Sequence, residues 1–145
     1  MESKERMFEH FRSLVSSRFE FLQARGFRRM PSLEETRSTF GTVVYLGKHV
    51  GFVLSLDVRD QCVDAEVVSV HDGKMIRNWE GGYSENVFTH LVKHAGLRRG
   101  FASSGERREN EEEQTSIERM IDDWADLLEG AGQALLQDGS KSLLG

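Results

Sequence analysis

The fold is decided by residues Leu56–Val67, LDVRDQCVDAEV. Apolar and polar residues alternate on each side of a short polar centre, and a period of two is typical of strands with one buried face. The polar centre at Asp60-Gln61 predicts a tight turn, so the two strands are expected to be antiparallel neighbours.

Further strands and turns flank this hairpin. Gly47-Lys48 suits a type II′ turn, and Asp72-Gly73 suits a type I′ turn. Because every connection is short, we predict a four-stranded antiparallel meander. Its strand segments are Thr42–Leu46, His49–Val58, Val63–His71 and Lys74–Trp79.

Helical periodicity lies on both sides of the predicted sheet. Residues 3–25 have apolar side chains at three- and four-residue spacing, and Gly26 suits a helix end. Arg18 interrupts that stripe, so its head either reaches solvent or pairs with a carboxylate of the sheet. A second helix is expected after a cap at Ser84. We therefore predict an α+β fold: an N-terminal helix, the meander and two C-terminal helices.

One domain is expected for a chain of 145 residues. Its helix–sheet–helix body spans 1–97, residues 98–114 are a charged loop or the start of a helix, and 115–137 form an acidic amphipathic helix. That last helix has three open interpretations: it packs on its own sheet, it forms a homodimer, or it docks to another protein. Trp124, central in its apolar stripe, suits an interface anchor.

Composition narrows the class of protein. Residues 1–108 hold 17 Lys/Arg against 14 Asp/Glu, whereas residues 109–145 hold 2 against 10. Nucleic-acid binding needs clustered positive charge, so it is not expected. No apolar run has the roughly 20 residues of a membrane span, and no signal-peptide pattern is present. The single cysteine, Cys62, rules out an internal disulfide, so a reducing cytoplasmic location is expected.

The hairpin also predicts a candidate site. Alternation places Asp57, Arg59, Asp64 and Glu66 on the sheet face opposite the predicted core. A two-residue turn would set Asp57 opposite Asp64, where like charges repel. A two-residue turn at Asp72-Gly73 would add Arg77 and Trp79 to the same face. Four interpretations stay open: a solvated surface, an acidic patch that binds a partner, a Mg²⁺ or Ca²⁺ site, or an acid–base pair.

Other signals for chemistry are sparse. His90 and His94 have the spacing of a helical metal pair but lack a neighbouring glutamate, so we interpret them as exposed helix surface. No motif for a phosphate, dinucleotide or nucleophilic serine occurs, and no cofactor, metal or catalytic residue is assigned.

The block Phe21–Gly73, with FLQARGF followed by VVYLGKHVGFVLSLDVRDQCVDAEVVSV, resembles a pattern in small uncharacterised bacterial α+β proteins. Some proteins of that layout are immunity proteins that neutralise toxins. The resemblance implies a non-enzymatic protein-binding module, an immunity-type inhibitor of a basic partner. The alternatives are a small metal-dependent enzyme that uses the face of Asp57, Asp64 and Glu66, and a structural homodimer.

Overall fold

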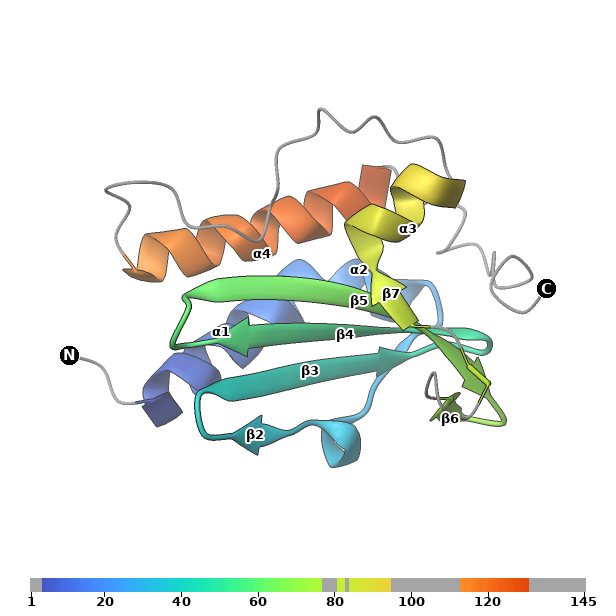
Figure 1. The fold of residues 1–145 in the computed structure, drawn as a ribbon, viewed down its shortest axis with the longest axis horizontal. Coiled ribbons are helices and arrows are strands. Elements are labelled where there is room, and N and C mark those ends of the chain that lie inside the picture. The colour runs from blue at the N-terminus through green and yellow to red at the C-terminus, as the bar shows by residue number, and fades with distance from the viewer. Residues whose placement is uncertain (1–3, 77–80, 83, 95–112, 131–145) are drawn as a thin grey trace.

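The computed structural model describes residues 4–76, 81–82, 84–94 and 113–130, and these form an α+β fold (Figure 1). The helices are α1 (Lys4–Arg18), α2 (Glu20–Ala24), α3 (Val87–His94), α4 (Glu113–Gly130) and a 3-10 turn, η1 (Pro31–Leu33). The strands are β1 (Arg28–Arg29), β2 (Thr36–Arg37), β3 (Phe40–Leu46), β4 (Val50–Asp57), β5 (Cys62–His71), β6 (Lys74–Ile76) and β7 (Ser84–Asn86). Within the described ranges, no helix is long and apolar enough to cross a membrane.

The antiparallel sheet has seven strands, so the predicted four-stranded meander is only partly correct. Three long strands, β3, β4 and β5, form its centre. Each outer edge is built from two short segments: β1 and β2 pair with β3, and β6 and β7 pair with β5. Pro31 begins η1 between β1 and β2, and proline has no N–H for a strand ladder. Short interrupted edges of this kind discourage pairing with other chains.

One of the two tight turns described next follows the prediction, and the other departs from it. His71 pairs with Lys74, and Asp72 and Gly73 both have positive φ, as a type I′ turn requires. The β3–β4 turn instead centres on Lys48 and His49, because the Gly47 N–H donates to the Val50 carbonyl at 2.7 Å. A Cβ on Gly47 would lie 2.7 Å from the Phe27 ring, so close packing explains this glycine.

The N-terminal helix is broken once, between α1 and α2. Val15, Phe19 and Leu22 are all fully buried across the break, so the apolar spacing alone does not reveal it. Gly26, at φ +92°, ends α2 as predicted. Arg18 donates to a carboxylate oxygen of Asp122 on α4 at 2.6 Å, so its partner is on the last helix and not on the sheet.

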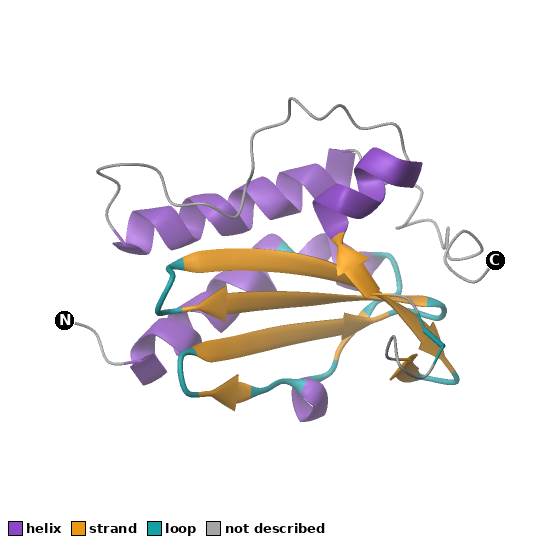
Figure 2. Cartoon of the chain, in the orientation of Figure 1, coloured by secondary structure: helices purple, strands orange, loops and turns teal. Residues whose placement is uncertain are grey.

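One face of the sheet carries the main core. Figure 2 shows the helices lying together on this side, and α1 and α4 both pack there. The Trp124 indole N–H donates to the Val63 carbonyl at 2.8 Å, which fastens α4 to β5. The apolar stripe of α4 is therefore buried on its own sheet, in residues Ile117, Met120, Ile121, Trp124, Leu127 and Leu128.

A buried ion pair joins β1 to the segment after η1. Arg29 donates two hydrogen bonds of 3.0 Å to the Glu34 carboxylate, which also accepts one from the Val44 N–H. The hydrogen bond to Glu34 raises the pKa of Arg29. Arg29 lies in β1, so this ion pair fastens the edge of the sheet.

Candidate functional site

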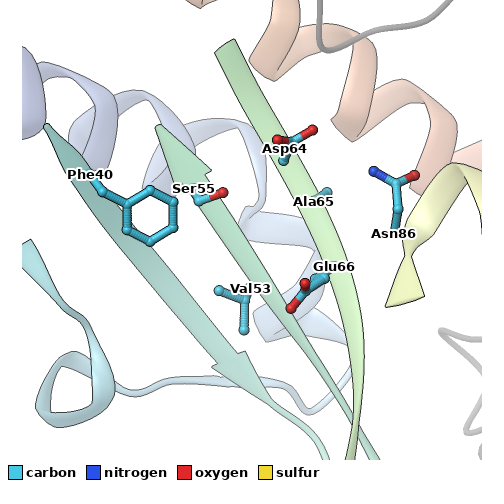
Figure 3. Close-up of a pocket in the computed structure, with 7 residues that line it drawn as sticks. All are labelled: Phe40, Val53, Ser55, Asp64, Ala65, Glu66 and Asn86. Atoms are coloured by element: carbon cyan, nitrogen blue, oxygen red, sulfur yellow. The ribbon is translucent and has the colours of Figure 1, made fainter. Parts of the chain in front are cut away.

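No helix among the described residues covers the opposite face of the sheet, which we call the open face. Two adjoining hollows of about 330 and 350 Å³ lie on it and share Phe40, Val53 and Glu66 (Figure 3). We call the two hollows together the groove. The first is also lined by Ser55, Asp64, Ala65 and Asn86, and the second by Leu33, Glu35, Arg37, Thr42, Val44 and Met75.

The groove has an apolar end as well as acidic positions. Val44, Leu46 and Val70 form a small buried cluster on the open face, against which Met30, Val53 and Met75 pack. The alternation of β3 and β4 predicts this second apolar patch, and the structure confirms it. Val44, Leu46 and Val70 are themselves buried, so a partner would meet the partly exposed Val53 and Met75 beside the carboxylates.

Strand register sets the neighbours of each carboxylate. Asp57 pairs with Cys62, Ser55 with Asp64, and Val53 with Glu66. The predicted pairing of Asp57 with Asp64 is wrong by two residues, because the connecting loop has four residues, 58–61, and not two. A shift of two residues preserves the face of every side chain, so the predicted sharing of one face is confirmed.

Asp57 has a structural task in that loop. One of its carboxylate oxygens accepts hydrogen bonds from the backbone N–H groups of Arg59, at 3.0 Å, and Asp60, at 3.2 Å. This is the turn-forming arrangement for which aspartate is favoured. Asp57 therefore stabilises the hairpin and does not line the groove.

Arg59 does not complete an ion pair on the open face. It lies in the four-residue loop and is exposed, and no described carboxylate pairs with its guanidinium. The prediction that Arg59 shares the face of the carboxylates required β4 to continue for two residues beyond Asp57. The longer loop removes it from the strand.

Asp64 lies in an electrostatically unfavourable place. Loss of surrounding water raises its pKa, and the nearby Asp57 charge raises it further, while a hydrogen bond from Cys62 opposes the shift. The Cys62 sulfur lies 3.8 Å from a carboxylate oxygen of Asp64. Burial and the nearby carboxylates raise the pKa of the Cys62 thiol to about 11, so it is protonated at neutral pH and is a poor nucleophile.

Asp64 and Glu66 have no cationic partner among the described residues, although both are exposed and line the groove. Several other acidic side chains of the described residues pair with a basic side chain. Examples are Glu34 with Arg29, Glu35 with Arg37, Asp122 with Arg18, and Asp123 with Arg119. Within the described part of the chain, no cation neutralises these two groove charges.

Asn86 and Phe40 are groove residues that the sequence pattern does not reveal. Asn86 follows the predicted cap at Ser84 and is the residue that caps α3: its side-chain oxygen accepts hydrogen bonds from the Phe88 and Thr89 N–H groups at 2.9 and 3.3 Å. Those donors require the oxygen on the α3 side, so the amide nitrogen points toward β5 (Figure 3). Phe40 lies two residues before the first predicted strand, Thr42–Leu46, so the prediction did not include it, whereas β3 begins at Phe40.

The remaining predicted residues do not join the groove. Trp124 is 3% exposed in the core, so it serves packing and is not a surface anchor. Arg77 and Trp79 lie outside the described residues. His90 is 2% exposed and buried, which corrects its interpretation as helix surface, because α3 faces the core with that side too. Among the described side chains, no three His, Cys, Asp or Glu residues are grouped to hold a metal ion.

Comparison of the chain with protein-family models, curated proteins and solved structures finds no significant match. The immunity-type resemblance of residues 21–73 accordingly stays a prediction. Function must therefore be inferred from the groove itself: its partly apolar lining, its two carboxylates that have no cationic partner among the described residues, and its position on the open face.

Proposed function

We propose that this chain is a non-enzymatic protein-binding module whose open face binds a basic segment of another protein. The observation that carries the proposal is that Asp64 and Glu66 line the groove without a cationic partner in the described part of the chain. A cation from a partner would supply the missing charge, and electrostatic attraction would also speed the encounter.

The apolar lining supports binding to a protein and not only to a small cation. Phe40, Val53 and Met75 are partly exposed and offer contact area beside the carboxylates. Lysine and arginine have apolar stems that pack on such surface while their charged heads reach an acid. Protein interfaces commonly combine an apolar centre with polar groups in this way.

The chemistry of the groove favours binding over catalysis. General acid–base catalysis works best where a site excludes water and separates two pKa values. Asp64 and Glu66 are both exposed to solvent. The Cys62 thiol, with its pKa raised to about 11, lacks the thiolate character of a nucleophile.

The more specific form of the proposal is an immunity-type inhibitor of a basic toxin. The resemblance of residues 21–73 implies this role, and a negatively charged groove suits a basic target. In such a complex, the open face would cover a basic surface of the partner and block its access to substrate.

Capture from native lysate tests the proposal with matched variants. The double variant D64N/E66Q removes two charges from the groove, and the control D126N/E129Q removes two from exposed positions of α4. We expect a partner that the wild type and the control retain and the groove variant loses. Equal capture by all three proteins, or no partner at low and physiological salt, would contradict the proposal.

A further inference from the structure

The partner's own geometry follows from the way the two groove carboxylates are spaced. Asp64 and Glu66 are alternate residues of β5, so both project from the open face. Two residues of a strand span about 6.6 Å. An extended segment has the same two-residue repeat, so it can present one cation to each carboxylate when it lies along β5.

The two carboxylates have different neighbours, which gives each cation its own setting. Asp64 has Ser55 opposite it and Cys62 two residues before it. Glu66 has Val53 on one side and Asn86 on the other. A lysine at Glu66 can therefore pack its stem on Val53, while a cation at Asp64 meets a more polar surrounding.

Asn86 adds a hydrogen-bond donor to the groove. Its side-chain oxygen is used by the Phe88 and Thr89 N–H groups. Its amide nitrogen points toward β5, and no described residue accepts a hydrogen bond from it (Figure 3). An extended segment exposes backbone carbonyls beside its side chains, so it offers an acceptor for this donor.

Other occupants fit less well. A helix docks through an apolar stripe at least about 100° wide, whereas this face alternates Val44 and Val53 with Ser55, Asp64 and Glu66. A second copy of the chain would bring the same acidic groove against itself, and the like charges would repel. The face therefore suits an extended cationic segment best.

We propose that the groove binds an extended segment of a partner protein with basic residues at alternate positions, Lys/Arg-x-Lys/Arg, laid along β5 with one cation at Asp64 and the other at Glu66. This inference rests on the proposed function and adds the conformation and charge spacing of the ligand.

Two peptides of equal composition and charge test the spacing, both acetylated and amidated at their ends. Ser-Thr-Lys-Val-Lys-Thr-Ser presents both lysines on one side when extended, and Ser-Thr-Val-Lys-Lys-Thr-Ser presents one on each side. Calorimetric titration should give tighter binding of the alternating peptide by about twofold to fivefold, the range expected for one added ion pair at a solvated site. D64N and E66Q should each remove that preference, and D126N/E129Q should retain it.

Each other result has a definite meaning. Equal binding of the two peptides, lost together in D64N/E66Q, would overturn the spacing and leave the basic-partner function standing. Peptide binding that persists in D64N/E66Q would show that the groove is not the binding site. It would overturn both the spacing inference and the proposed function of the groove. If neither peptide binds, the extended-segment inference fails, and the capture experiment decides separately whether the groove serves a folded basic surface.

Discussion

Replacing Trp124 by phenylalanine tests whether α4 belongs to this chain's own core. The substitution keeps an aromatic ring but removes the indole N–H that donates to the Val63 carbonyl at 2.8 Å. Trp124 is only 3% exposed, so water cannot readily replace the lost donor. Leaving a buried acceptor without its donor costs about 1–3 kcal/mol. We expect W124F to lower the free energy of unfolding by about 2 kcal/mol.

Urea denaturation followed by circular dichroism measures this loss. The control is D126N, an exposed position of the same helix, which should stay within about 0.5 kcal/mol of the wild type. Light scattering on the same samples should give one mass for all three proteins. A W124F protein with unchanged stability and half the wild-type mass would refute the core placement, because Trp124 would then act between two copies.

Two further predictions concern Asp64 and Gly41. Because the pKa of Asp64 is raised in the folded state, its charge destabilises the fold above that pKa, and the penalty disappears as the pH falls toward the ordinary value of 3.8. D64N should therefore stabilise the protein at pH 7 by about 0.5 kcal/mol, a small effect because the group is exposed. In a series of denaturation curves at different pH, this gain in stability should vanish near pH 4. A gain that grows as the pH falls would contradict the raised pKa of Asp64. A Cβ on Gly41 would lie 2.6 Å from the Phe8 ring, so G41A should lower the free energy of unfolding by about 1–3 kcal/mol. The control is G130A, whose Cβ would meet no atom within 4 Å and which should not lower it. Equal stability of the two variants would show that Phe8 moves aside freely.

The faces of the central strands could be predicted from the sequence, but their register could not. Alternation fixes which side chains share a face, so Asp64 and Glu66 were placed together correctly. The number of loop residues is not encoded in that alternation, because loops of two and four residues preserve the same faces. Asp72-Gly73 was predictable because its positive φ angles need particular residues. The conformation of residues 58–61 instead depends on hydrogen bonds that the Asp57 carboxylate accepts from the Arg59 and Asp60 N–H groups.

The edge strands of the sheet and the residues that line the groove could not be predicted from the sequence pattern, for a different reason. β1, β2 and β7 are two or three residues long, too short to show a period. Their pairing depends on distant partners, as in the ion pair of Arg29 with Glu34. Whether α4 covers the same sheet face as α1 or the opposite one is likewise a tertiary choice. Its apolar stripe is compatible with both, and tertiary contacts such as the Trp124–Val63 hydrogen bond and the Arg18–Asp122 ion pair distinguish them.

The most direct test of the central claim is an NMR titration of the labelled chain with Ser-Thr-Lys-Val-Lys-Thr-Ser. Binding in the groove predicts that amide shifts concentrate at residues that line the first hollow, among them Val53, Ser55, Asp64, Glu66 and Asn86. Shifts confined to the acidic outer side of α4 would contradict the assignment of the open face as the binding surface. The absence of any shift at high peptide concentration would contradict it as well.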